Sequence, residues 1–379
     1  MDFDFSPEQQ QLSDAITRWT EKNYSFEQRK QIIHSDAGIS EHAWKALAEL
    51  GVLALPVPSA HEGFDGTPVD QMVVMQALGR ALVVEPVVAT AMGVQFLKLG
   101  GGHGELLAQV ASGSLKLACA LNERQARHDL HDIAVTARRH GDAYVIDGEK
   151  TGVVHGAQAG QLIVSARSSV ALRDEQGISL LVIPGQTAGV SIRDARSNDG
   201  LRIATIRFSG VRIPAGALLG TEGKAWGLLD AAADHGAVLL CAEALGAMEA
   251  LQAATLEYIR TRQQFGVPIG KFQVLQHRMA DMFMQLEQAR SMTLLAAVKV
   301  SSSEAVERRR IVSAAKARVG EAMKFIGQQA VQLHGGMGVT DEMPAAHYFK
   351  RLSAIELMLG DTDHHLARFI AQPGFAQAA

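Results

Sequence analysis

Two short segments carry residue types that suit an anionic ligand with a flat ring. The first runs from Tyr258 to Ile269 and contains Arg262, Phe265 and Gly266. A helix is expected to end near Gly266, which leaves the Arg262 guanidinium able to face a phosphate or diphosphate. Phe265 is then free to cover a flat ring. Taken alone, the segment is more typical of a helical hairpin with a surface arginine.

The second segment runs from Gln332 to Thr340 and is rich in glycine, with Gly335, Gly336 and Gly338. A long helix is expected to stop there, and the bare backbone of the turn lets a ligand approach closely. One such glycine turn is weak evidence. Together with the first segment it predicts a binding surface built from two helix ends.

Three regions must position these segments. A capping pattern, Ser6-Pro7-Glu8-Gln9, opens a helical region over residues 1–112. Short β-branched runs separated by turns follow over 113–222, and long apolar helical stripes fill 223–379. We therefore expect an α+β multi-domain fold, with an N-terminal helical domain, a central antiparallel β-domain and a C-terminal four-helix bundle that also makes subunit contacts.

Composition excludes several classes of function. The 379 residues have a net charge of -4 and 5% aromatic residues, which disfavours nucleic-acid binding. The two cysteines, Cys119 and Cys241, lie far apart in apolar runs and are expected to be buried free thiols. No signal peptide or membrane span is expected, so the predicted location is cytoplasmic.

The two segments together resemble the acyl-CoA dehydrogenase family. They match its signatures R-x-[TQ]-F-G-x-P-I and Q-x-x-G-G-x-G, and Gly141–Lys150 is similar to part of its β-domain. His347–Leu352 and Gly360–His365 are most similar to small subunits of pimeloyl-CoA-type dehydrogenases. This likeness hints at dicarboxylate, aromatic-degradation or steroid intermediates, in lipid or steroid catabolism, by analogy alone.

The resemblance implies a flavoprotein that desaturates an acyl-CoA thioester. FAD would lie in a groove between domains and reach into the neighbouring subunit, a carboxylate would remove the α-proton, and the β-hydride would pass to the flavin. Electron-transfer flavoprotein would be the electron acceptor. By the same resemblance, the diphosphate and adenosine of a partner subunit's FAD would be held by Arg262, Gln264, Phe265, Gln273, Gln332, Gly335 and Gly336.

The catalytic carboxylate of the family is missing from both of its usual positions. Leu359 and Gly236 stand there, and neither can take up a proton. His235 and Asp361 are weak candidates for a displaced base, because a helix turns His235 about 100° away from its neighbour and Asp361 lies two residues too far along. Asp234 and Glu356 are displaced in a similar way.

The side of the site that would hold the flavin ring is altered too. The loop Asn122–Asp129 replaces a family pattern that carries glycines, and Gly152 stands where an aromatic residue is expected. The chain thus keeps residues that reach another subunit's FAD and loses those that build its own flavin pocket.

Three hypotheses follow. The chain is the base-lacking subunit of a heteromeric acyl-CoA dehydrogenase, paired with a paralogue that carries the glutamate. Alternatively, it is an autonomous homo-oligomeric enzyme with a displaced base, or a structural or regulatory paralogue without catalysis. No metal is expected: His128, Asp129, His131 and Asp132 are interpreted as a solvated polar loop, and Asp361, Asp363, His364 and His365 as a charged helix end.

Overall fold

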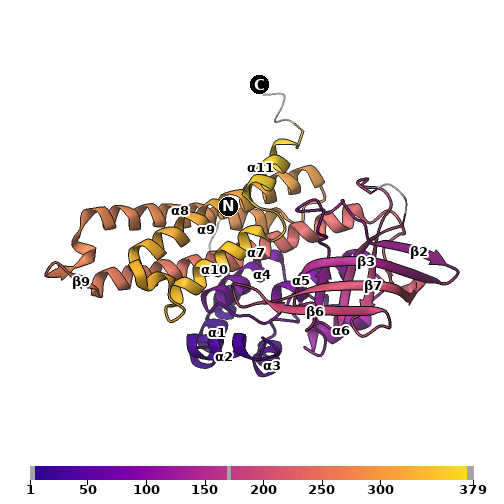
Figure 1. Cartoon of the computed structure of the whole chain (residues 1–379), viewed down its shortest axis with the longest axis horizontal. Coiled ribbons are helices and arrows are strands. Elements are labelled where there is room, and N and C mark those ends of the chain that lie inside the picture. Colours follow the sequence, from indigo (N-terminus) through magenta and orange to yellow (C-terminus); the bar gives the residue numbers. More distant parts are fainter. Residues whose placement is uncertain (1–4, 169–171, 374–379) are drawn as a thin grey trace. The chain divides into compact units, whose positions relative to one another are not determined.

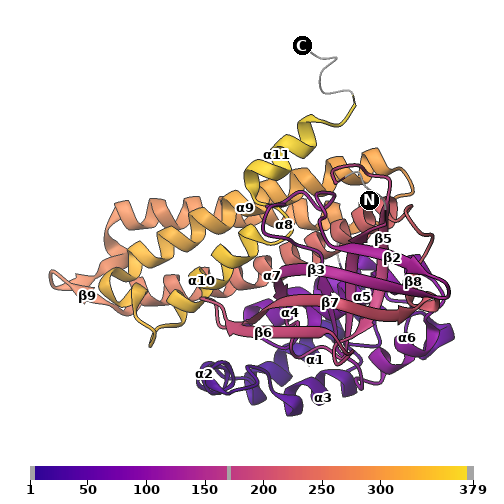
Figure 2. The same cartoon turned by 45° about the vertical axis from the view of Figure 1, so that its right-hand side comes forward.

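The computed structural model describes residues 5–168 and 172–373 (Figures 1 and 2). The chain forms two compact units, one made of residues up to 30, 68–83 and from 237 onward, the other of 31–67 and 84–236. The helical content and the mostly antiparallel sheet confirm the predicted fold class. The division at 112/113 and 222/223 remains a prediction.

The first unit is helical. Its elements are α1 (Pro7–Asn23), most of α2 (Phe26–His34), α4 (Pro68–Arg80), the greater part of α7 (Trp226–Thr261), the strands β9 (Gln263–Gln264) and β10 (Val267–Pro268), α8 (Gln273–Lys299), α9 (Ala305–His334), α10 (Pro344–Leu357) and α11 (Thr362–Ile370). The expected start of α1 is confirmed: the Ser6 hydroxyl accepts from the Gln9 N–H, and the Gln9 side chain accepts from the Ser6 N–H.

Close packing of α4 against α7 depends on two glycines. A Cβ on Gly79 would lie 2.1 Å from the Glu243 carbonyl oxygen, and one on Gly246 would lie 1.9 Å from the Gln76 carbonyl oxygen. Neither position has room for a side chain. The two helix backbones therefore approach each other at reciprocal glycine contacts.

The predicted methionine stripe is core. Met279, Met282 and Leu286 of α8 are buried against α9. The polar run over 301–310 predicts a solvated connection from the sequence, but this prediction is wrong for most of the run, because α9 begins at Ala305 and buries Arg308. Charged residues at a helix start resemble a loop in sequence when only their polarity is counted.

Helix α7 is long and apolar enough by length and composition to cross a membrane. In the structure, 72% of its most apolar window is buried inside the protein. Burial of this kind is typical of the core helix of a bundle, and we interpret α7 as one.

The second unit contains the sheet, with strand order β6-β7-β3-β2-β4-β5-β8 and β1 paired to β4. Its elements are α3 (Glu41–Glu49), α5 (Val87–Gly100), α6 (Gly104–Ala111), β1 (Leu117–Ala120), β2 (Thr136–His140), β3 (Ala143–Val154), β4 (Gln161–Arg167), β5 (Ile178–Pro184), β6 (Val190–Arg196), β7 (Arg202–Pro214) and β8 (Leu218–Leu219). The pairings are antiparallel except β1–β4 and β2–β4, which are parallel.

One predicted strand is displaced. The β-branched run at 133–137 predicts a strand from the sequence, but β2 begins at Thr136. The N–H groups of Ala134 and Val135 instead donate to the carboxylate of Glu123, at 2.8 and 3.1 Å. A side chain takes the hydrogen bonds that a neighbouring strand would otherwise supply.

Candidate functional site

A tight hairpin follows the end of α7. Gln264 of β9 pairs with Val267 of β10, so Phe265 and Gly266 form a two-residue turn. Both residues have positive φ, 56° and 78°, the pattern of a type I′ turn. Such a turn favours asparagine and glycine, so a phenylalanine there is strained. The ring is nevertheless 90% exposed and packs only edge-on against Phe272.

The glycine turn follows the end of α9. Gly335 adopts a left-handed φ of 62° and opens the short helical turn Gly335–Val339. A Cβ on Gly335 or Gly336 would meet no atom within 4 Å, so the backbone there is open. Gly338 is different, because its Cβ would lie 2.6 Å from the Val331 carbonyl oxygen. The turn therefore packs against α9 at Gly338, whereas its backbone is uncovered at Gly335 and Gly336.

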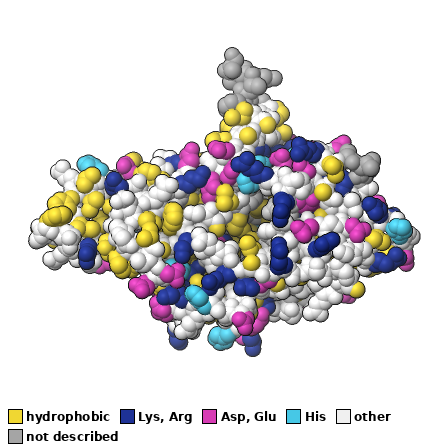
Figure 3. Space-filling view, in the orientation of Figure 1, with side chains coloured by type: hydrophobic (Ala, Val, Ile, Leu, Met, Phe, Trp, Pro, Cys, Tyr) yellow, Lys and Arg dark blue, Asp and Glu magenta, His cyan; other side chains and the backbone are white. Residues whose placement is uncertain are grey.

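The structure brings the two segments together. The rings of Tyr258 and His334 stack with centroids 4.4 Å apart, and the Tyr258 hydroxyl donates to the His334 carbonyl oxygen at 3.3 Å. Arg278 Nη1 donates to Gln329 Oε1 at 2.9 Å. All of these residues belong to one compact unit. Figure 1 shows the hairpin, labelled β9, at the far end of the helical bundle, with hydrophobic side chains gathered on that end in Figure 3.

This bundle end presents an exposed arginine and open glycine backbone, which suit a phosphate or diphosphate. Arg262 is exposed and makes no ion pair with any residue of the described ranges 5–168 and 172–373. Helix α8 begins at Gln273 without a side-chain cap, so its N-terminal N–H groups and dipole favour an anion. The remaining residues expected here are also exposed, namely Gln264, Phe265, Gln273, Gln332, Gly335 and Gly336.

Leu359 lies in a loop that other side chains hold in place. Its φ is 54°, a left-handed value, and its carbonyl oxygen accepts from His365 Nε2 at 2.9 Å. The buried ammonium of Lys316 donates to the carbonyl oxygens of Ile355, Glu356 and Gly360, at 3.1, 3.0 and 2.9 Å. Two of these carbonyls belong to the last turn of α10, where a cation is favoured. The position where the base is expected therefore holds an apolar side chain, in a loop that these hydrogen bonds fix.

The carboxylates near Leu359 have other roles. Asp361 caps α11, because its Oδ1 accepts from the His364 N–H at 2.8 Å. Glu356 accepts from Lys324 and from both the N–H and the hydroxyl of Thr362. Burial would raise the pKa of Glu356, but the hydrogen bonds from Lys324 and Thr362 outweigh it and lower that pKa. A carboxylate with this many donors is a weak base.

His235 is also poorly suited to remove a proton. It is 4% exposed, next to the buried Gly236 in α7. Burial, aided by the charge of Lys98, lowers the pKa of His235 to about 4. A histidine with this pKa is neutral at pH 7 and binds a proton only weakly.

His235 predicts an acid sensitivity of stability. The unfolded chain takes up a proton at this residue near pH 6.5, whereas the folded chain does so only near pH 4. The free energy of unfolding is therefore unaffected by protonation of this residue above pH 6.5. It decreases as the pH falls from 6.5 toward 4, by about 1.4 kcal/mol per pH unit, because only the unfolded chain binds the proton. Urea unfolding between pH 7 and 5 measures this slope. His235→Gln should flatten it, and an unchanged slope in the variant would contradict the assignment.

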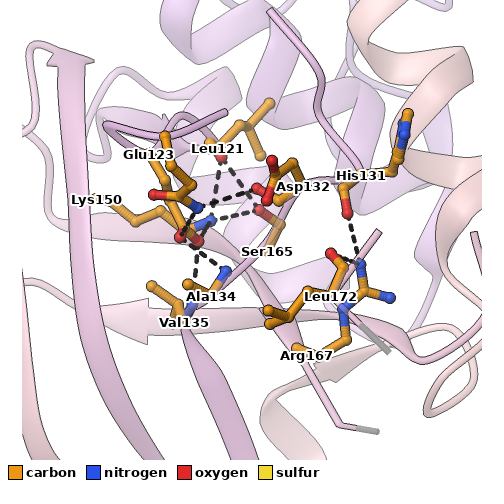
Figure 4. A network of polar contacts seen from close by, with 11 residues as sticks. Leu121, Glu123, His131, Asp132, Ala134, Val135, Lys150, Ser165, Arg167 and Leu172 are labelled. Atoms are coloured by element: carbon orange, nitrogen blue, oxygen red, sulfur yellow. Dashed lines mark hydrogen bonds and ion pairs between the residues drawn. The ribbon is translucent and has the colours of Figure 1, made fainter. Parts of the chain in front are cut away.

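In the second unit, the segment after β1 is shaped by a buried ion pair (Figure 4). Lys150 Nζ donates to Glu123 Oε1 at 2.8 Å, to the Leu121 carbonyl at 3.1 Å and to Ser165 Oγ at 2.9 Å. Burial lowers the pKa of Lys150 to about 8. Burial would raise the pKa of Glu123, but Lys150 and the hydrogen bonds from Gln125 and Ala134 together outweigh it and lower that pKa. The loop Asn122–Asp129 is therefore anchored near its start by the Glu123–Lys150 ion pair, and its arginines, Arg124 and Arg127, are exposed.

Gly152 leaves a gap at the position where the family resemblance predicts an aromatic ring. It is exposed on β3 with a φ of 64°, and a Cβ placed on it would meet no atom within 4 Å. Gly152 itself therefore contributes no aromatic ring at this position. Within residues 5–168 and 172–373, no group of three or more His, Cys, Asp or Glu side chains is arranged to hold a metal ion.

Some residues that shape these sites were missed. Lys316 lies between Ala315 and Ala317 in a buried stripe, and a lysine at such a position signals a buried contact. Tyr258 lies in the first segment, but the sequence pattern indicates no role for it. Its stacking on His334 joins residues 76 positions apart, which no local pattern reveals.

Comparison with known proteins gives a consistent result along the chain. Residues 6–103, 118–211 and 223–372 match models described as the N-terminal, middle and C-terminal domains of acyl-CoA dehydrogenase. A curated relative, the probable acyl-CoA dehydrogenase YngJ of Bacillus subtilis (strain 168), is 27% identical over 372 residues, covering 96% of this chain and 97% of that one.

Two solved structures are similar over nearly their whole length. The FAD complex of PigA superposes with a TM-score of 0.90 at 23% identity, covering 99% of this chain and 100% of that chain. The ChsE4-ChsE5 complex from Mycobacterium tuberculosis contains a chain with a TM-score of 0.86 at 24% identity, covering 97% of each. At these identities the two structures establish the fold.

Proposed function

Because the chain belongs to the acyl-CoA dehydrogenase family of flavoproteins, we propose that it is the base-lacking subunit of a heteromeric enzyme. The observation that carries the proposal is a contrast within one compact unit. The bundle end offers an exposed arginine and bare glycine backbone. In contrast, the position where the base is expected holds Leu359, in a loop fixed by Lys316 and His365.

FAD is the cofactor of this enzyme family, and when bound it accepts the hydride from the β-carbon of the acyl-CoA. The residues of this chain would hold the far part of a cofactor whose ring belongs to the partner subunit. Arg262 would pair with the diphosphate, the glycine turn would let its backbone approach, and Phe265 would cover a flat ring. The proton would be taken by the glutamate of the partner.

A structural neighbour supports the heteromeric arrangement. The ChsE4-ChsE5 structure is a complex of two differently named chains, one of which shares this fold. The partner that we propose is accordingly a paralogous acyl-CoA dehydrogenase subunit. Electron-transfer flavoprotein as the acceptor, the acyl chain of the substrate, the likeness to pimeloyl-type subunits and a cytoplasmic location stay predictions.

The missing base is tested by substitution in the assembled enzyme. His235→Gln and Asp361→Asn remove the two residues considered as displaced bases, and asparagine preserves the cap of α11. We expect both variants to keep the wild-type rate of acyl-CoA dehydrogenation when they are combined with the wild-type partner. A loss of more than about a hundredfold in either variant, without a loss of folding, would favour the autonomous enzyme.

Phe265→Asn is expected to stabilise the isolated chain and weaken the assembled enzyme. Asparagine tolerates the left-handed turn, which relieves about 1 kcal/mol of strain, and the lost ring is 90% exposed. Thermal unfolding measures the first effect and retained FAD measures the second. Val274→Asn is the control, since it removes another exposed apolar side chain without relieving a turn. A Phe265→Asn variant that melts lower and retains FAD fully would contradict this interpretation.

A further inference from the structure

We propose that Tyr258 and His334 are positioning residues that hold Arg262 and the glycine turn in the arrangement needed for the FAD diphosphate. This inference rests on the proposed function, in which the bundle end lends FAD contacts to a partner subunit. The pair lies behind that surface: His334 is 3% exposed and Tyr258 is half-buried. We therefore infer that Tyr258 and His334 affect FAD binding through Arg262 and the glycine turn.

On the α7 side, Tyr258 is tied directly to Arg262. The Arg262 N–H donates to the Tyr258 carbonyl at 2.8 Å, which closes the last turn of α7. The Ile269 N–H in turn donates to the Arg262 carbonyl at 2.9 Å, which closes the hairpin back onto the helix end. The Tyr258 backbone is therefore joined by hydrogen bonds to Arg262 and, through Arg262, to the hairpin.

On the α9 side, His334 is the last residue before the open glycines. Its Nδ1 donates to the Ala330 carbonyl at 2.8 Å, which fixes the plane of the ring along the helix. Its own carbonyl oxygen, one of the unsatisfied acceptors at a helix end, accepts from the Tyr258 hydroxyl. Gly335 follows at once with its left-handed φ of 62°. The hydroxyl thus fixes the peptide group from which the glycine turn starts.

Among the contacts described above, the Tyr258–His334 stack joins the two segments directly, whereas the Arg278–Gln329 hydrogen bond joins α8 to α9. Arg278 contacts α9 more than a turn before the glycines, so it cannot set the orientation of the 334–335 peptide. The stack with its hydroxyl bond is the contact placed to do so. We infer that the pair sets the spacing between the guanidinium and the open backbone.

The test measures FAD affinity of the enzyme assembled with the partner subunit. Tyr258→Phe keeps the stacked ring and removes the hydroxyl, and we expect the FAD dissociation constant to rise about fivefold. Tyr258→Leu removes the stack as well and should raise it about tenfold further. At saturating FAD, kcat should return to the wild-type value in both variants, because neither residue touches the reacting atoms.

Thr261→Ala is the matched control. Its hydroxyl also bonds to backbone carbonyls at the end of α7, those of Glu257 and Tyr258, but it does not reach α9. Its FAD dissociation constant should match the wild type. A second readout uses the chain alone: hydrogen exchange of peptides covering 335–340 should quicken in Tyr258→Phe and not in Thr261→Ala.

The outcomes separate this inference from the proposed function. An assembly that retains FAD equally well with and without the Arg262 side chain would overturn both. An Arg262 variant that loses FAD, beside a Tyr258→Phe variant within twofold of the wild type, would overturn this inference alone. A Tyr258→Phe variant that lowers kcat even at saturating FAD would also overturn it, because positioning of the diphosphate does not predict such a loss.

Discussion

Replacing Arg262 with alanine is expected to weaken FAD binding by the assembled enzyme about 10- to 100-fold. The guanidinium is exposed and unpaired within the described residues of the chain, so its charge is available for the diphosphate, and a charge-assisted hydrogen bond contributes about 1.5–3 kcal/mol. FAD titration of the complex measures the loss. The isolated chain should melt at an unchanged temperature, because no internal contact is removed.

Arg260 provides the control for this effect. It is exposed two residues earlier on α7, and a helix turns it about 200° away from Arg262. Arg260→Ala removes the same charge from the same bundle end and should leave FAD affinity within about twofold of the wild type. Equal losses in the two variants would mean that general charge, and not a site at Arg262, attracts the cofactor.

The second large effect concerns stability. Arg351 and Glu243 form a buried two-point ion pair between α10 and α7, at 2.6 and 2.8 Å, and each residue is 4% exposed. Arg351→Met leaves a carboxylate buried without its cation, and we expect a loss of about 3–5 kcal/mol in the free energy of unfolding. Urea denaturation of the isolated chain measures it.

A double variant separates the pair from simple packing. In Arg351→Met with Glu243→Gln the uncompensated charge is gone, so the double variant should be more stable than Arg351→Met alone. The losses in free energy of unfolding of the two single variants could instead add in the double variant, with no stability regained. The carboxylate in Arg351→Met would then be already solvated or protonated, and the argument from buried charge would fail.

The sequence was informative where a local pattern decides the structure. The capping residues Ser6 and Gln9 set the start of α1, and the methionine stripe of α8 set its buried face. The signatures at 262–269 and 332–338 led to the bundle end because the two segments together resemble motifs of one family, whereas either segment alone is typical of an ordinary helix end. The fold class followed from the change in hydrophobic period along the chain.

Long-range contacts account for what could not be predicted. The strand expected at 133 starts at Thr136 because the carboxylate of Glu123, which lies outside the sheet, accepts from two N–H groups 11 and 12 residues along the chain. The loop around Leu359 is held by Lys316, whose three acceptors lie 39 to 44 residues away. Periodicity describes which face of an element is apolar, but it does not identify the partner of a single buried polar group.

The most direct test of the central claim is bleaching of the flavin by acyl-CoA. Visible absorbance would be followed for this chain alone with added FAD, for the paralogue carrying the glutamate alone, and for the two chains expressed together. We expect bleaching by the mixed assembly and none by this chain alone, because Leu359 and Gly236 cannot accept the α-proton. Bleaching by this chain alone, at the rate of the mixed assembly, would contradict the account.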